Sequence, residues 1–186
     1  MNRSFGLATV TASCLYIILV NACLAASTEY EVKATFLYNF AKFVDWPAQA
    51  VSGSGSVFSI CLAGDPFEGA FDRVIQGEIL DGKPLMARRI AAGDDLQGCQ
   101  IIYVAPSEAF RSRDIINAAA NAPILTVGEA DDFIDDGGIV RFVKTGGRIH
   151  FQINPDAAQR ASLKVSSRLL RLADIVRPRQ HAGAIR

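Results

Sequence analysis

Short apolar segments that alternate with helical segments constrain this fold more than any other feature of the sequence. Three segments are apolar almost throughout, at residues 57–63, 101–104 and 124–127, and a fourth at 84–90 carries two arginines near its end. Short runs without in–out alternation are typical of parallel strands buried on both faces of a sheet. Helices are expected between these strands, at 67–76, 107–120 and 130–136.

The C-terminal part of the chain has a different pattern. Two strands at 139–143 and 148–153 flank Lys144-Thr145-Gly146-Gly147, which predicts a hairpin. Ile149, Phe151 and Ile153 alternate with Arg148, His150 and Gln152. A long final helix is expected from Asn154 or Asp156 to about Val176, with a buried stripe formed by Ala161, Val165, Leu169, Leu172 and Val176.

Together these elements predict one three-layer α/β domain. Its sheet is mixed and mostly parallel, gains an antiparallel hairpin on the C-terminal side, and carries helices on both faces. The sequence shows no internal repeat and no linker to a second domain.

The first 26 residues have the pattern of a secretory signal peptide. Arg3 provides a positive start, the segment around residues 15–20 is apolar, and small residues at 24–26 suit cleavage. A retained membrane anchor is the alternative, but this apolar run is short and interrupted by polar residues. Lipid attachment at Cys23 is a weaker possibility, because Asn21 stands where a small residue is usual. The predicted division is a signal peptide at 1–26, the domain at 27–178 and a flexible tail at 179–186.

Composition and charge limit the kinds of function that the protein can have. Half of the residues are hydrophobic, a fifth are charged and the formal net charge is zero. Such a chain is globular rather than disordered, and roughly 160 residues after the leader suffice for a hydrophobic core. Nothing in the charge balance indicates nucleic-acid binding or a basic membrane-binding surface.

Two cysteines remain outside the leader, Cys61 and Cys99. In an exported protein a pair of this kind is more often bonded than free, and two separately buried thiols are the alternative. The bond would stabilise the fold by about 4 kcal/mol if chain entropy dominates.

An aromatic block, KATFLYNFAKFVDWP at residues 33–47, follows the leader. Phe36, Phe40 and Phe43 recur at helical spacing, which predicts that they dock a helix on the sheet. Tyr38 falls outside this stripe and Trp46 lies at the helix exit. These two are predicted to belong to an interface.

The sequence contains no constellation that indicates catalysis or a metal site. HExxH, CxxC and phosphate-binding glycine motifs are absent, and the acidic residues at 129–136 are interpreted as a solvated helix. Arg148 and His150 share one strand face about 7 Å apart, which suits a carboxylate, a phosphate, an amino-acid ligand or acidic residues of a partner. An ordinary exposed strand face is the alternative. No enzyme activity, cofactor or metal is therefore expected.

Three motifs carry a resemblance that covers essentially the whole chain after the leader. The aromatic helix motif, GGRIHFQIN at 146–154 and the segment LKVSSRLL at 163–170 resemble the YfiR family of exported regulators. The resemblance implies a periplasmic, non-enzymatic α/β protein that forms homodimers. It also implies a ligand-responsive surface that includes Arg148 and His150. Family members with a second cysteine pair have no counterpart here, so a two-disulfide redox switch is not expected.

The function that the resemblance implies is repression by protein–protein contact. The protein would bind the periplasmic domain of an inner-membrane diguanylate cyclase, lower cyclic di-GMP signalling and limit biofilm formation. One alternative is a small-ligand sensor for another membrane receptor such as a histidine kinase. A periplasmic hydrolase is a third hypothesis, disfavoured by the missing catalytic residues.

Overall fold

The computed structural model describes residues 29–48, 50 and 56–178. A helix at residues 29–43 comes first. The strands are β1 (Val44–Asp45), β2 (Phe58–Ala63), β3 (Ile79–Leu80), β4 (Lys83–Ile90), β5 (Cys99–Val104), β6 (Leu125–Gly128), β7 (Val140–Thr145), β8 (Arg148–Ile153), β9 (Lys164–Val165) and β10 (Asp174–Ile175). The further helices are α3 (Ala70–Ile75), the 3-10 helix η1 (Pro106–Arg111), α4 (Ser112–Ala119), α5 (Pro155–Arg160) and α6 (Ser167–Leu170).

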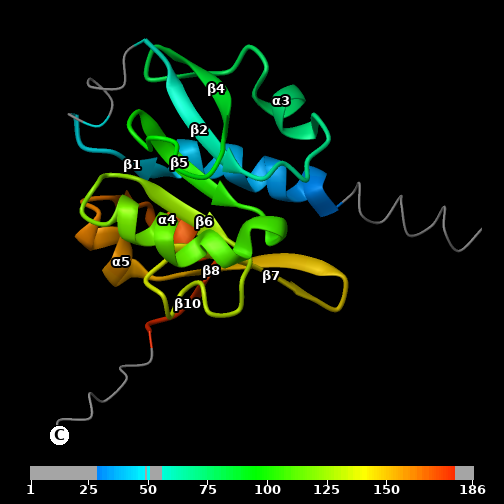
Figure 1. The fold of residues 1–186 in the computed structure, drawn as a ribbon, viewed down its shortest axis with the longest axis vertical. Coiled ribbons are helices and arrows are strands. Elements are labelled where there is room, and N and C mark those ends of the chain that lie inside the picture. Colours follow the sequence, from blue (N-terminus) through cyan, green and yellow to red (C-terminus); the bar gives the residue numbers. More distant parts are fainter. Residues whose placement is uncertain (1–28, 49, 51–55, 179–186) are drawn as a thin grey trace, which may run out of the picture.

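Eight strands form one mixed sheet in the order β10-β8-β7-β6-β5-β2-β4-β3 (Figure 1). The run from β4 to β7 is parallel, β7 and β8 form the antiparallel hairpin, and β10 joins β8 in parallel. Every residue of β5 and β6 is buried, as the apolar sequences of these central strands predict. The predicted fold class is therefore confirmed.

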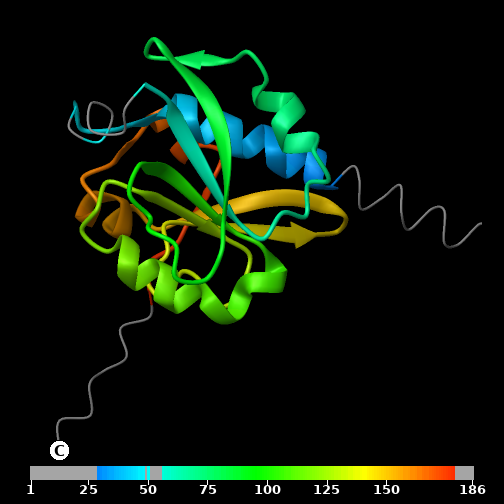
Figure 2. The same cartoon turned by 45° about the horizontal axis from the view of Figure 1, so that its top comes forward.

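Helices cover the two faces of the sheet, as Figures 1 and 2 show. The helix at 29–43 and α3 share one large apolar cluster with β2, β5, β7 and β8. On the opposite face, α4 packs its buried residues Ile115, Ile116 and Ala119 against a second cluster. The first face also carries the sheet's largest aromatic group.

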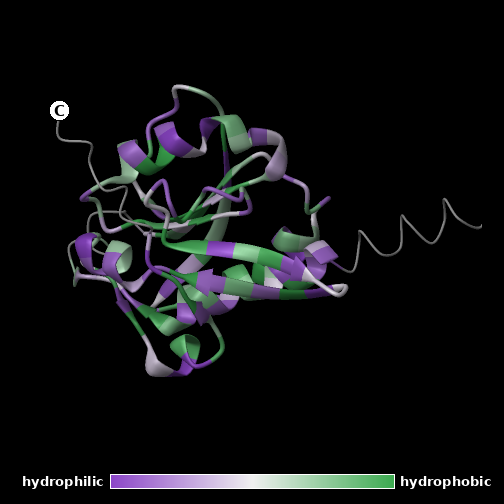
Figure 3. Ribbon diagram, turned by 90° about the horizontal axis from the view of Figure 1, so that it is seen from below, coloured by the Kyte–Doolittle hydropathy of each residue, from purple (hydrophilic) through white to green (hydrophobic). Residues whose placement is uncertain are grey.

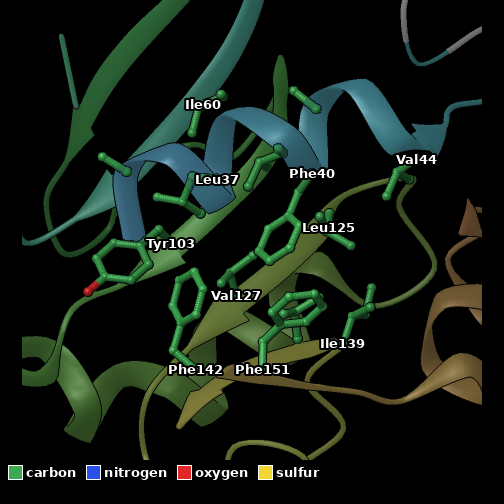
Figure 4. Close-up of a cluster of buried hydrophobic side chains, with 14 of the residues drawn as sticks. Leu37, Phe40, Val44, Ile60, Tyr103, Leu125, Val127, Ile139, Phe142 and Phe151 are labelled. Atoms are coloured by element: carbon green, nitrogen blue, oxygen red, sulfur yellow. The ribbon is translucent and has the colours of Figure 1, made fainter. Parts of the chain in front are cut away.

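Phe40 is the centre of this aromatic group (Figure 4). It is fully buried, with its ring centroid 5.8 Å from that of Phe142 and 5.1 Å from that of Phe151. Phe36 stacks beside it, and Phe43 packs on the same cluster. The prediction that this aromatic stripe docks the helix on the sheet is confirmed.

The prediction of a long final helix is wrong. Residues 155–175 form the short helices α5 and α6 and the short strands β9 and β10. Ser162 interrupts the helix with a positive φ of 59°, and Leu163 N donates to Ala158 O at this turn. β9 then pairs with β1, and Ser166 caps α6 through Leu169 N. The helical periodicity was coincidental, because Leu172 is 71% exposed while Leu169 is buried.

The prediction of an acidic helix at 130–136 is also wrong. These residues form a tight loop around Phe133, which is fully buried. Gly128 and Gly138 hold the ring between them, since an added Cβ at either position would lie 2.3 Å from it. Gly138 N donates to Phe133 O and closes the loop.

The predicted signal peptide at 1–26, the lipid-anchor alternative at Cys23 and the tail at 179–186 lie outside the described residues. Within residues 29–48, 50 and 56–178, no helix is both long and apolar enough to cross a membrane.

Candidate functional site

The hairpin at the carboxyl edge of the parallel strands carries two of the four predicted binding residues, Arg148 and His150. β7 ends there, the hairpin turn follows, and β8 starts back from the same edge. Glu129 follows β6, and the helix at 29–43 begins close by, because Glu29 accepts from Lys144 of the hairpin at 2.5 Å. Figures 1 and 2 show the β7–β8 hairpin projecting from the body of the molecule.

One side of this hairpin presents polar side chains, as predicted from the alternation in β8. Phe151 and Ile153 are buried, whereas Arg148, His150 and Gln152 are exposed or half-buried. Hydrophilic and hydrophobic residues alternate along the paired strands in Figure 3. His150 Nε2 lies 3.5 Å from Asp174 Oδ2 of β10. We call Arg141, Arg148, His150, Gln152 and Asp174 the hairpin polar face.

Arg141 belongs to this face and was missed in the sequence. It pairs in register with Gln152, and its Nη1 donates to Gln152 Oε1 at 3.4 Å. Its Nη2 also binds Asp131, from the loop around Phe133. The Nε atom is buried and has no partner within the described part of the chain. The alternation of Val140, Arg141 and Phe142 in β7 was the signal that could have identified it.

A buried charge cluster lies behind the hairpin. Lys33 is only 2% exposed, and its Nζ lies 2.7 Å from Glu129 and 2.5 Å from Glu29. Tyr103, which is fully buried in β5, donates its hydroxyl to Glu129. The cluster connects the first turn of the N-terminal helix to β5, to the end of β6 and, through Lys144, to the hairpin. Sequence reasoning missed it because its members lie far apart in the chain.

The ionisation of the cluster follows from burial and pairing. Burial opposes the charge of Lys33, but hydrogen bonds and charges of Glu129 and Glu29 outweigh it and raise the pKa of Lys33. Burial likewise opposes the charge of Glu29, yet Lys144 and Lys33 hold its pKa below the ordinary value. Burial, followed by the charge of Glu129, raises the pKa of Tyr103 strongly. The tyrosine is therefore a neutral donor between charged neighbours.

Trp46 and Tyr38 lie elsewhere. Trp46 Nε1 donates to Gln100 O at 3.3 Å, and its ring packs edge-on against Phe58 at 5.1 Å. The Tyr38 hydroxyl contacts Glu78, near β3. Gln100 lies in β5, three strands away from β8, and Glu78 precedes β3, at the other end of the sheet from the hairpin. The structure therefore does not unite the four predicted binding residues in one cluster, and Trp46 and Tyr38 stay predictions.

The Cys61–Cys99 disulfide is present and joins β2 to the start of β5, with Cα atoms 5.8 Å apart. Arg88 of β4 covers it: Nη2 lies 2.9 Å from Cys99 Sγ and also donates to Asp95 O. Both cysteines are buried. The bond thus fixes two central strands and, through Arg88, the third strand beside them.

The described residues contain no group of three or more His, Cys, Asp or Glu side chains arranged to hold a metal ion. The exposed guanidinium of Arg148 and the half-buried imidazole of His150 can instead bind a carboxylate or another anion.

The fold and this site define a single-domain α/β protein with a polar hairpin surface. Comparison with known families gives a more specific assignment, because the model of the YfiR/HmsC-like family matches residues 30–174. The chain therefore belongs to the YfiR/HmsC-like family, a family of regulatory proteins, and the resemblance noted in the sequence is confirmed.

Proposed function

We propose that this protein binds the periplasmic domain of an inner-membrane diguanylate cyclase and holds the enzyme inactive. Repression lowers cyclic di-GMP and biofilm formation. Family membership across residues 30–174 is the observation that carries the proposal. The protein acts in the periplasm, where its disulfide is stable, and works as a homodimer.

The hairpin polar face is the proposed contact surface. Arg148 is exposed and His150 is 36% exposed, so both can reach an acidic group of the partner or of a small ligand. Asp174 of β10 pairs in register with Gln152, so this short strand extends the same face with an exposed carboxylate. A surface that mixes basic and acidic side chains suits the polar rim of a non-obligate protein interface.

Repression requires a difference in affinity. The protein shifts the cyclase toward its inactive state only to the extent that it binds that state more tightly. A rigid binding surface supports such selectivity, and the Lys33 cluster provides rigidity by joining the hairpin to the N-terminal helix. A ligand bound at Arg148 and His150 would compete with the partner for the same surface.

The test uses a matched pair of charge reversals. Arg148→Glu lies on the hairpin polar face, and Arg73→Glu lies on an exposed position of α3. In cells lacking the wild-type gene, we expect R73E to restore low cyclic di-GMP and R148E to leave it high, with equal amounts of both proteins. Normal repression by R148E would exclude the hairpin as the contact surface. An unchanged cyclic di-GMP level on deletion of the gene would exclude the proposed function.

A second function, a small-ligand sensor for another receptor such as a histidine kinase, is favoured by the same Arg148 and His150 pair. Co-purification from detergent-solubilised membranes separates the two. Recovery of a diguanylate cyclase supports the first function, and recovery of a histidine kinase alone supports the second.

A further inference from the structure

The sheet has a topological switch point at β2, away from the hairpin. β4 lies on one side of β2 and β5 on the other. The chain leaves β2 toward α3, which packs in the first apolar cluster, whereas it leaves β5 toward η1 and α4 on the opposite face. Where successive connections diverge in this way, a crevice opens outside the carboxyl ends of the strands, and ligands of α/β proteins bind there.

A cavity of about 600 Å³ occupies this crevice. A second cavity of about 430 Å³ adjoins it and shares Ala92, Asp94, Phe110 and Arg111 with the first. Volumes of a few hundred Å³ are typical of sites for small organic molecules. The walls are the ends of β2 and β4, the segments that follow them, and residues of η1 and α4.

Gly64 permits the close approach that forms the floor of the crevice. Its φ is +75°, and an added Cβ would lie 2.8 Å from Ala105 Cβ and 2.9 Å from Ser107 Oγ. A larger residue would push apart the segments that follow β2 and β5. The crevice therefore depends on glycine at this position.

The two arginines of the cavity are engaged by the protein itself. Arg89 binds Asp65 at 2.6 Å and Asp72 at 2.8 Å. Arg111 binds Glu108 at 2.8 Å and donates to Ala91 O at 2.8 Å, which ties the end of β4 to η1. These guanidinium groups hold the walls in place, so an anion would have to displace a carboxylate to reach them.

The groups that remain accessible favour a cation. The linings of the two cavities contain Asp65, Asp94, Glu108 and Asp114 against Arg89 and Arg111, a formal charge of −2. Phe110 is 79% exposed and lines both cavities. An exposed aromatic ring beside carboxylates attracts an organic cation through its π face and through the surrounding negative charge. Apolar neighbours such as Ile90, Leu96 and Ile115 suit the body of such a molecule.

We propose that the crevice at the carboxyl ends of β2, β4 and β5 is a binding site for a small organic amine with an apolar body. The ammonium group lies near Asp94 and the ring of Phe110, and the apolar body enters the cavity between them. The site is separate from the hairpin polar face, so it adds a second, cationic ligand class to the proposed regulator.

The test is an NMR titration of the purified protein with phenethylamine. 2-Phenylethanol is the neutral control and 3-phenylpropionate the anionic control. We expect saturable shifts at the amides of Gly64, Ala92 and Phe110 with the amine, and about fivefold or greater weakening in Phe110→Ala and in Asp94→Asn. Glu31→Gln, an exposed carboxylate of the N-terminal helix, and Arg148→Glu should leave the affinity unchanged.

Both test variants should fold. Phe110 is exposed, and Asp94→Asn keeps a side-chain oxygen that can accept from Ala91 N, as Asp94 does. Equal binding of the alcohol, tighter binding of the acid, or amine-induced shifts confined to the hairpin would overturn the proposal. None of these results depends on the cyclase, so failure of this site and failure of the proposed function are distinguishable.

Discussion

At the residue scale, Lys33 is the most consequential side chain that the sequence did not reveal. A buried lysine is tolerated only when its charge is paired, and here Glu29 and Glu129 provide that pairing. In the sequence Lys33 looked like one polar position in an aromatic helix. Its role depends on Glu129, which lies 96 residues away.

We predict that Lys33→Met lowers the free energy of unfolding by about 3 kcal/mol, because it leaves Glu129 buried without its cation. Lys42→Met is the matched control on the exposed side of the same helix, with an expected loss below about 1 kcal/mol. Urea denaturation measures both. The loss in the double variant Lys33→Met/Glu129→Gln should be smaller than the sum of the losses in the two single variants. A loss equal to or larger than that sum would contradict the pairing.

The acid sensitivity of the fold provides a second prediction. The pKa of Glu29 is lower in the folded protein than its ordinary value of about 4.5. The stability that Glu29 contributes is therefore complete above that value and is lost as the pH falls through the folded pKa. Denaturation at pH 7 and at pH 3 should show a smaller loss on acidification for Glu29→Gln than for the wild type. An identical loss in both proteins would contradict the assignment.

At the element scale, the region after α5 shows how tertiary pairing overrides local periodicity. β9 forms because β1 offers it a partner, with Val44 opposite Val165, and β10 forms because β8 has a free edge. The sequence between residues 155 and 176 does not indicate that β1 and β8 will pair with these segments. The loop around Phe133 is likewise set by packing rather than by helical periodicity, because Gly128 and Gly138 on either side leave room for its ring.

The two leucines near α6 test this arrangement directly. Leu169 is buried and Leu172 is 71% exposed, although a continuous helix would bury both. We expect Leu169→Ala to cost about 3 kcal/mol of unfolding free energy and Leu172→Ala less than about 0.5 kcal/mol. Thermal and urea denaturation of the two variants measure the difference. Similar losses at both positions would favour the helix predicted from the sequence.

At the scale of the whole molecule, one apolar cluster extends from the N-terminal helix and α3 along one face of the sheet to α6. Phe40 contacts both strands of the hairpin, and Trp46 rests on Phe58 in β2. The distant parts of the chain therefore share contacts, which is the condition for cooperative unfolding.

Trp46 is the only tryptophan, so its fluorescence reports this cooperativity from one place. We predict that urea transitions followed by Trp46 fluorescence and by far-UV circular dichroism share one midpoint. An earlier fluorescence transition would mean that the region around Trp46, β2 and β5 opens before the rest of the molecule.

The sequence by itself determined the class of fold, the hairpin and the packing of the aromatic helix, because each depends on periodicity within a short segment. The alternation that exposes Arg148 and His150 is local in the same sense. Only the tertiary structure decided the Lys33 cluster, the broken C-terminal segment and the crevice at β2. Each of these joins residues that are distant in the chain, and the energy of burying or pairing them exists only once the sheet has brought them together.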